Sequence, residues 1–146
     1  MKILVAVDFS TALQAVVDEA RKLGKALNAT MWLLHVTEPN PELAGFQAAS
    51  KEVRDYVARK FHQEHKQLQD IAAGLREAGL DCSAHLVQGL TVDTILDEAG
   101  KFGADAIMVG SHGKGAVTRL LVGSTSEGLL KRSPLPVIVV PTHGRS

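Results

Sequence analysis

Residues 3–7 read Ile3-Leu4-Val5-Ala6-Val7, an unbroken apolar run that Asp8 follows directly. Similar runs occur at residues 31–36, 106–109 and 137–140, and a weaker one covers residues 84–87. Strands with one face in water alternate apolar and polar residues, whereas unalternating runs are typical of strands buried on both faces. The runs therefore predict five strands of a parallel sheet that is covered by helices on both faces.

Amphipathic stretches lie between these runs. From Leu13 to Leu27 the apolar residues recur at helical spacing, and Ser10 or Thr11 is the expected N-cap. A second helix is expected behind Thr91. The longest is expected from near Ala48 to Gly79, with these apolar positions: Val53, Val57, Phe61, Leu68, Ile71 and Leu75.

Alternation of strand and helix to the end of the chain predicts parallel strands joined by right-handed crossovers. The expected fold is a doubly wound, Rossmann-like open α/β sandwich with five strands. A chain of 146 residues suits one domain of this kind, covering residues 1–146. Ligands of such sheets bind outside the carboxyl ends of the strands, so the informative loops are those that leave each strand.

Composition excludes several classes of partner. Lysine plus arginine equals aspartate plus glutamate at 16 each, so the chain lacks the basic excess that nucleic acid or an anionic membrane surface requires. The single cysteine, Cys82, cannot form an internal disulfide, which favours a cytoplasmic location. The run at residues 3–7 is too short for a signal-peptide core, and no segment approaches the roughly 20 apolar residues of a membrane span.

The segment after residues 106–109 carries the candidate chemistry. It begins Gly110-Ser111-His112-Gly113-Lys114-Gly115 and reaches Gly123-Ser124-Thr125-Ser126-Glu127 after a further stretch. Glycines let main-chain amides approach an anion, and a helix that starts at Ser124 would add amides and a favourable dipole. Two alternatives stay open here: Ser124 and Glu127 fit a capping box, and the glycines fit simple turns.

The glycine spacing resembles a known motif. The pattern consists of Gly110, two residues, Gly113, nine residues and then Gly123-Ser124. This pattern resembles the ATP-binding motif of the universal stress protein family. Residues 3–8 resemble the family's opening strand and acidic turn. Residues 134–141, Pro-Leu-Pro-Val-Ile-Val-Val-Pro, resemble its closing strand. The resemblance covers almost the whole chain and implies a member of the ATP-binding type.

The resemblance implies two groups of ligand contacts. Phosphates are expected on the main-chain amides of the glycine segment and of the helix start: Gly110, Ser111, His112, Gly113, Lys114, Gly115, Ala116, Gly123, Ser124, Thr125 and Ser126. Adenosine is expected near Ala6, Asp8 and Val36. Magnesium is expected to arrive with the nucleotide, near Asp8, although an acidic residue at this position also fits a helix cap. The family often has glycine where this chain has Phe9, which predicts a narrower rim.

The implied function is regulatory. We expect an ATP-binding universal stress protein in which nucleotide occupancy orders the loop between Gly113 and Gly123 and so modulates a signalling interaction. The choice among ATP, ADP and AMP stays open, because main-chain amides that bind phosphate do not distinguish nucleotides by their number of phosphate groups. Two alternatives are a slow ATPase or nucleotidyl-transfer enzyme, for which no catalytic residue is assigned, and an interaction module without ligand.

A homodimer is expected through the run at residues 137–140. Pro136 and Pro141 flank this run, and prolines at both ends of a strand indicate a sheet edge. Four apolar residues from Val137 to Val140 at an edge favour pairing with a second copy. Members of the family that the chain resembles commonly pair through this strand.

Overall fold

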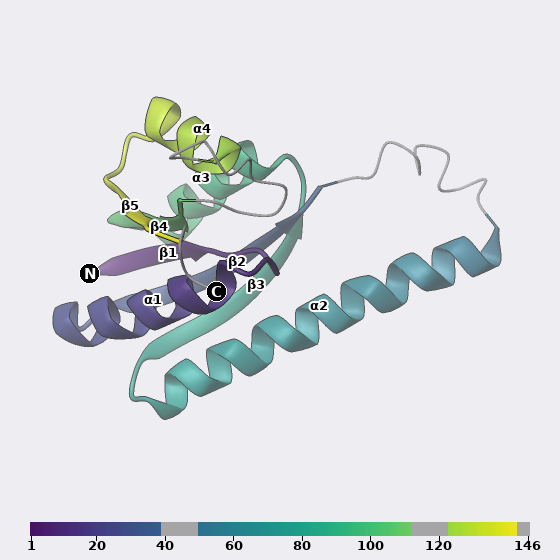
Figure 1. The fold of residues 1–146 in the computed structure, drawn as a ribbon, viewed down its shortest axis with the longest axis horizontal. Helices are drawn as coiled ribbons and strands as arrows, with labels where there is room; N and C mark the ends of the chain where they lie inside the picture. Colours follow the sequence, from purple (N-terminus) through teal and green to yellow (C-terminus); the bar gives the residue numbers. More distant parts are fainter. Residues whose placement is uncertain (39–49, 112–122, 143–146) are drawn as a thin grey trace.

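The computed structural model of the protein describes residues 1–38, 50–111 and 123–142. Strands and helices alternate along these ranges (Figure 1). The elements in chain order are β1 Lys2–Ala6, α1 Leu13–Leu27, β2 Thr30–Thr37, α2 Lys51–Glu77, β3 Asp81–Gln88, α3 Thr91–Phe102, β4 Ala106–Gly110, α4 Ser124–Arg132 and β5 Val137–Val140.

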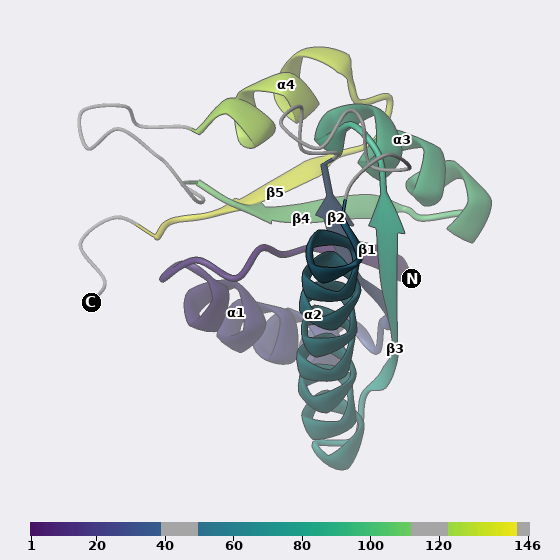
Figure 2. The ribbon, with the colours of Figure 1, turned by 90° about the vertical axis from the view of Figure 1, so that its right-hand side faces the viewer.

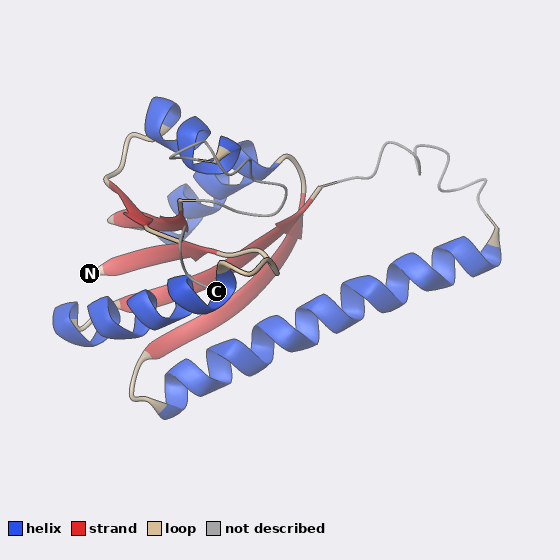
Figure 3. Ribbon diagram, viewed as in Figure 1, coloured by secondary structure: helices blue, strands red, loops and turns tan. Residues whose placement is uncertain are grey.

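The strands form one parallel sheet in the order β3-β2-β1-β4-β5 (Figure 3). The chain builds outward from β1 to β2 and β3, and then returns past β1 to add β4 and β5. Winding therefore reverses between β1 and β4, where the loops that leave these two strands diverge. The five-stranded, doubly wound α/β fold predicted from the sequence is confirmed.

Alternate residues of the central strands supply two separate cores. Ile3 and Val5 of β1 pack with α1 and α2, whereas Leu4 and Ala6 pack with α3 and α4. Figure 2 shows the two helical layers on opposite faces of the sheet. Burial on both faces is the physical reason why the run of β1 does not alternate with polar residues.

The two edge strands differ in how well the sequence indicated them. β5 lies at one edge of the sheet, as its flanking prolines predicted. β3 lies at the other edge and pairs with β2 over all eight of its residues, so it is longer than the run at residues 84–87 that predicted it. Polar residues at both ends of β3 hid its length, because an edge strand is only partly covered.

The start of α1 differs from its prediction. Ala12 is the N-cap residue and no described side chain caps the helix, so the assignment of Ser10 or Thr11 as N-cap is wrong. Ser10 instead accepts a hydrogen bond from the Ala12 N–H at 3.2 Å through Oγ and one from the Leu13 N–H at 3.1 Å through its carbonyl. This tight turn delays the helix.

Both ends of α2 lie inside the predicted range. The Ser50 hydroxyl caps the helix by accepting a hydrogen bond from the Val53 N–H at 3.3 Å. The predicted start at Ala48 lies outside the described residues. The predicted end at Gly79 is two residues late, because the helix ends at Glu77 and Gly79 has a φ of 94°, a conformation that favours glycine.

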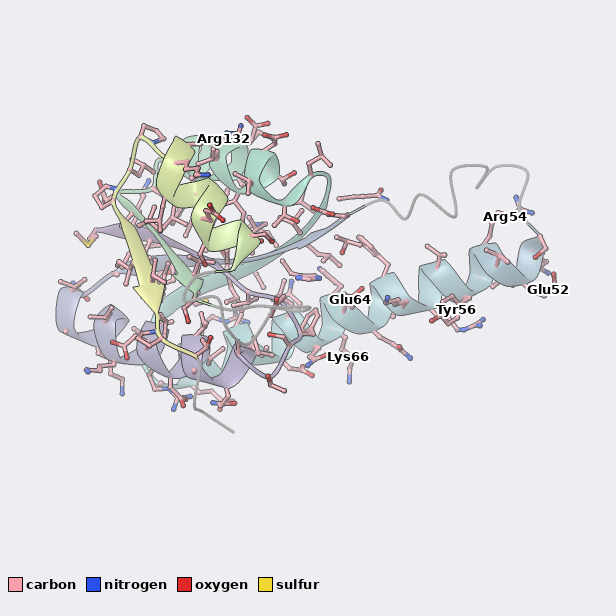
Figure 4. All side chains as sticks on the ribbon, turned by 45° about the horizontal axis from the view of Figure 1, so that its top comes forward. Glu52, Arg54, Tyr56, Glu64, Lys66 and Arg132 are labelled. Carbon is pink, nitrogen blue, oxygen red and sulfur yellow. The ribbon has the colours of Figure 1, made fainter. Side chains whose placement is uncertain are left out.

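Only the C-terminal half of α2 covers the sheet, and the N-terminal half projects beyond it (Figure 1). Leu68 and Leu75 are buried, whereas Tyr56 is 61% and Phe61 43% exposed. The placement of Phe61 on a buried apolar face is therefore wrong, because the sheet ends before these turns. Figure 4 shows Tyr56 on the projecting part. Although α2 has 27 residues, no described helix is long and apolar enough to cross a membrane.

Candidate functional site

A cavity of about 650 Å³ lies at the carboxyl ends of β1, β2 and β4, where the winding reverses. Its described lining includes these predicted site residues: Ala6, Asp8, Val36, Gly110, Gly123, Ser124, Thr125 and Ser126. The structure thus brings the end of β1 together with a helix start that lies more than 100 residues further along the sequence. Ser111 is absent from this lining, and residues 112–116, which include His112, Gly113, Lys114, Gly115 and Ala116, lie outside the described residues.

The start of α4 faces this cavity. Gly123 is the N-cap residue and no described side chain caps the helix. The capping box that Ser124 and Glu127 suggested is therefore not formed: Ser124 is the first helical residue, and the Glu127 carboxylate lies 3.1 Å from the ammonium of Lys131. The first N–H groups of a helix have no intrahelical partner, so this end offers donors and partial positive charge to an anion.

Two serines fix the position of this helix start. Ser126 is 1% exposed and donates its hydroxyl hydrogen to the carbonyl of Gly110, which ties α4 to the end of β4. The Gly123 N–H donates to the carbonyl of Ser111. The hydroxyl of Ser111 is turned to Thr142 at 3.1 Å, so this side chain stabilises the junction of β4 and β5.

The start of α3 is occupied from within the chain. The carboxylate of Glu38 accepts hydrogen bonds from the Thr91 N–H at 3.1 Å and from the Thr91 hydroxyl at 2.7 Å. These two hydrogen bonds hold the pKa of Glu38 below its ordinary value. Of the starts of α3 and α4, which lie at the same end of the sheet, only that of α4 has no described side chain bonded to its first N–H groups.

The end of β2 presents main-chain groups to the cavity. Val7 donates its N–H to the carbonyl of Leu34 at 2.9 Å, toward β1. Gly89 donates to the carbonyl of Thr37 at 3.0 Å, on the side of β3. Because alternate residues of a parallel strand face alternate neighbours, the N–H and C=O of Val36 face the side on which the pairing of β1 has ended. This peptide edge is suited to reading a flat heterocycle.

Asp8 lies beside this edge in the turn after β1. Its Oδ1 accepts hydrogen bonds from the N–H of Ser10 at 3.2 Å and from the hydroxyl of Ser10 at 2.5 Å. The carboxylate thus stabilises the turn before α1 without being the N-cap of the helix. In the described part of the chain, no group of three or more His, Cys, Asp or Glu residues could hold a metal ion. Asp8 is one of three described carboxylates in the cavity lining, with Glu38 and Glu64.

Several lining residues were missed from the sequence. The Oγ1 of Thr37 is buried and has no hydrogen-bond partner among the described residues, and Thr37 lines the cavity. His35 is another missed residue, and its ring packs on that of Phe9, which the sequence predicted at the rim, at 4.7 Å between centroids. Lys60 and Glu64 reach the cavity from α2. The position of Thr37 at the end of a strand was a signal that it could line a ligand site. Lys60 and Glu64 gave no such signal, because no local sequence pattern shows which turn of α2 passes the cavity.

The structure is that of a doubly wound α/β protein with a cavity at its strand-order switch point. Residues 1–141 match the model of the Universal stress protein family, and the chain belongs to that family. Universal stress protein MJ0577 of Methanocaldococcus jannaschii is 27% identical over 151 aligned residues, which cover 95% of this chain and 93% of the relative. A universal stress protein of Thermus aquaticus is 33% identical over 141 residues, covering 94% and 96%.

Solved structures agree with this assignment. The structure of MJ0577 superimposes with a TM-score of 0.80 at 28% identity and covers 96% of this chain and 94% of that one. The structure of UspA from Lactobacillus plantarum superimposes with a TM-score of 0.75 at 27% identity and covers 96% and 97%. The family resemblance read from the glycine spacing is confirmed.

Proposed function

We propose that residues 1–146 form one domain that binds an adenine nucleotide, ATP in the first instance, and acts as a regulatory protein in the cytoplasm. The observation that carries the proposal is the start of α4, which no described side chain caps and which lines the same cavity as Val36. A volume of about 650 Å³ lies within the range of about 300–1,000 Å³ that is usual for small-molecule sites.

Two proteins with this fold support the choice of ligand. One is a universal stress protein in complex with cAMP, with a TM-score of 0.66 at 24% identity. The other is a universal stress protein family protein from Arabidopsis thaliana with AMP bound, with a TM-score of 0.71 at 18% identity. Both ligands combine an adenine ring with phosphate, which are the two chemical features that the ends of the cavity suit.

Different residues would bind the phosphate and the adenosine parts of the nucleotide. The N–H groups of Ser124, Thr125 and Ser126 would hold phosphate oxygens, together with the main chain of residues 110–116. Val36 would read the adenine edge, Ala6 would pack against the ring, and Asp8 would hold the ribose or a magnesium ion. The ion would keep most of its ligands as water and phosphate oxygens, which fits a cavity with a single suitable carboxylate in the turn after β1. Occupancy of the cavity would then modulate a signalling interaction.

Isothermal titration with ATP and Mg²⁺ tests the proposal through one matched pair of variants. Ser124→Pro removes one main-chain donor, and proline is tolerated because position 124 is the first of the helix and Gly123 is extended at ψ 170°. Loss of a hydrogen bond to a charged group is worth about 1.5–3 kcal/mol, so the dissociation constant should rise by roughly 10- to 150-fold. Ser124→Ala keeps the N–H and should change affinity little.

The outcome that refutes nucleotide binding is an unmodified chain that takes up no ATP, ADP or AMP at about 1 mM ligand. Equal affinities in Ser124→Pro and Ser124→Ala would remove the phosphate assignment at α4. The same samples, assayed for phosphate release, separate a binding protein from a slow ATPase.

We also propose that two copies pair through β5. The carbonyls of Pro136 and Val140 accept hydrogen bonds from β4, so by alternation the main chain of Val139 faces the open edge. Val139→Pro therefore removes an outward donor and leaves the bonds to β4 intact. Sedimentation should show a dimer for the unmodified chain and a monomer for the variant. A dimer that persists in Val139→Pro contradicts pairing through this edge, and Leu130→Asn, at an exposed position of α4, is the control.

A further inference from the structure

A buried histidine joins the projecting helix to the turn that carries Asp8. The Nδ1 of His35 lies 2.9 Å from the carbonyl oxygen of Val7, and its Nε2 lies 3.0 Å from Oε2 of Glu64 on α2. The two side chains are 11% and 18% exposed. Figure 4 shows Glu64 near the middle of α2, between the part packed on the sheet and the projecting part that carries Tyr56.

The turn after β1 is tied to this imidazole on two sides. The carbonyl of Val7 accepts its hydrogen bond immediately before Asp8 in the chain, and the ring of Phe9 packs on the imidazole immediately after it. A change in the position of His35 therefore moves both neighbours of Asp8. Glu64, by holding the other ring nitrogen, sets where the imidazole lies.

The two partners of His35 restrict where its ring hydrogens lie. A carbonyl oxygen only accepts, so Nδ1 carries a hydrogen. When the Glu64 carboxylate is ionised it also only accepts, so both hydrogen bonds then require the imidazolium. Neutral imidazole has one N–H, so loss of the proton breaks the bond to Val7 or the bond to Glu64.

Among the described residues, three other charged groups line the cavity beside this pair: Asp8, Glu38 and Lys60. Asp8 and Glu38 line the same cavity from the ends of β1 and β2, and Glu38 is bonded to Thr91. Lys60 reaches the cavity one turn before Glu64 on α2. From α1 and its N-cap residue the described lining residues are Ala12, Leu13 and Val16, which do not titrate. In β3 the residue paired with His35 is Leu86, and β3 contributes no described residue to the lining.

We propose that Glu64 and His35 are positioning residues for the ligand site: as the imidazolium, His35 holds the turn that presents Asp8, and ligand affinity falls when the imidazolium loses its proton. The inference rests on the proposed nucleotide site and names a pH dependence that the site alone does not require. It also links the projecting half of α2 to the ligand, because a partner that moved α2 would move Glu64.

The test compares the pH dependence of ATP binding in the unmodified chain and in Glu64→Gln, from about pH 5.5 to about pH 8.5, where imidazoles titrate. A carboxamide accepts a hydrogen bond from imidazolium and donates one to neutral imidazole, so this variant keeps both bonds of His35 in either state. The terminal phosphate of ATP titrates identically in every sample, and the informative quantity is therefore the ratio of the two dissociation constants.

We expect the unmodified chain to lose about three- to tenfold in affinity relative to Glu64→Gln between the two ends of this range, the effect of about one hydrogen bond. His65→Gln is the control, because it removes an exposed imidazole from the same helix, where its Nε2 lies 3.3 Å from the Nε2 of Gln69. It should follow the unmodified chain at every pH. Thermal unfolding of each variant confirms that it is folded.

A constant ratio across the range overturns the positioning role, as does a change in His65→Gln equal to that in Glu64→Gln. Unmodified chain that binds no ATP at any pH overturns the proposed function itself, and the two failures are therefore distinguishable. Histidine NMR provides a readout without ligand: at the acidic end both ring nitrogens of His35 should carry hydrogens, and a single protonated nitrogen there also overturns the inference.

Discussion

Replacing Thr37 by valine should stabilise the ligand-free protein and weaken its binding of ATP. The Oγ1 of Thr37 is buried in the cavity wall without a hydrogen-bond partner among the described residues. A buried polar group in this state costs about 1–3 kcal/mol, and valine has nearly the same shape without the hydroxyl. For a chain of this size 1 kcal/mol corresponds to roughly 3 °C in Tm, so we expect Tm to rise by about 3–9 °C.

The same substitution should lower ATP affinity by about three- to tenfold, since a ligand that met the hydroxyl would lose one hydrogen bond. Opposite signs for stability and affinity are typical of a polar group kept for binding. Thr142→Val is the matched control: Thr142 is 7% exposed, its hydroxyl lies 3.1 Å from that of Ser111, and its loss should lower stability by about 1 kcal/mol. Calorimetry and titration measure both quantities. A Thr37→Val protein that is less stable, or that binds ATP unchanged, refutes this reasoning.

Three further predictions follow from burial and charge. Leu68→Ala should lower the free energy of unfolding by about 2–5 kcal/mol in chemical denaturation, because this side chain is fully buried. Phe61→Ala, at a residue that is 43% exposed, should change it by no more than about 0.5 kcal/mol. Equal effects would contradict the described path of α2. Burial raises the pKa of the Cys82 thiol from 9.0 to about 11, so alkylation near pH 8 should be at least about 100-fold slower in folded than in unfolded protein. The lowered pKa of Glu38 stabilises the folded protein at pH values above 4.5, the ordinary pKa of the group, and this contribution is lost as the pH falls through the pKa of the folded state. Amide exchange at Thr91 should accelerate in that acidic range in the unmodified chain and not in Glu38→Gln.

Local patterns predicted the elements better than their ends. The run of β1 and the helical spacing after Leu13 were correct because each reports burial of neighbouring residues on one element. The predicted cap of α1 was wrong because Asp8 and Ser10 form a tight turn with hydrogen bonds of their own before the helix begins. Phe61 was wrong because a helical pattern does not show where the sheet beneath it ends.

The candidate site shows the same division. Gly110, Gly123 and Ser124 were recognisable because their spacing is a property of the chain itself, and so is Asp8 at the end of an apolar run. His35 and Glu64 were not assigned to the site, because they are 29 residues apart on different elements. Thr37 was not assigned either, although it follows Val36 at the end of β2. The capping box at Ser124 could be rejected only when Gly123 was seen to be the N-cap.

The amino-acid sequence by itself determined the doubly wound α/β fold, the family and the segments that reach the carboxyl edge of the sheet, because apolar periodicity and glycine spacing are encoded along the chain. Only the tertiary structure decided which helix start is open, where Ser111 turns its hydroxyl, and that α2 brings Glu64 to His35. These facts depend on strand order and on the angle at which helices cross the sheet, which arise from packing between residues that are distant in the sequence.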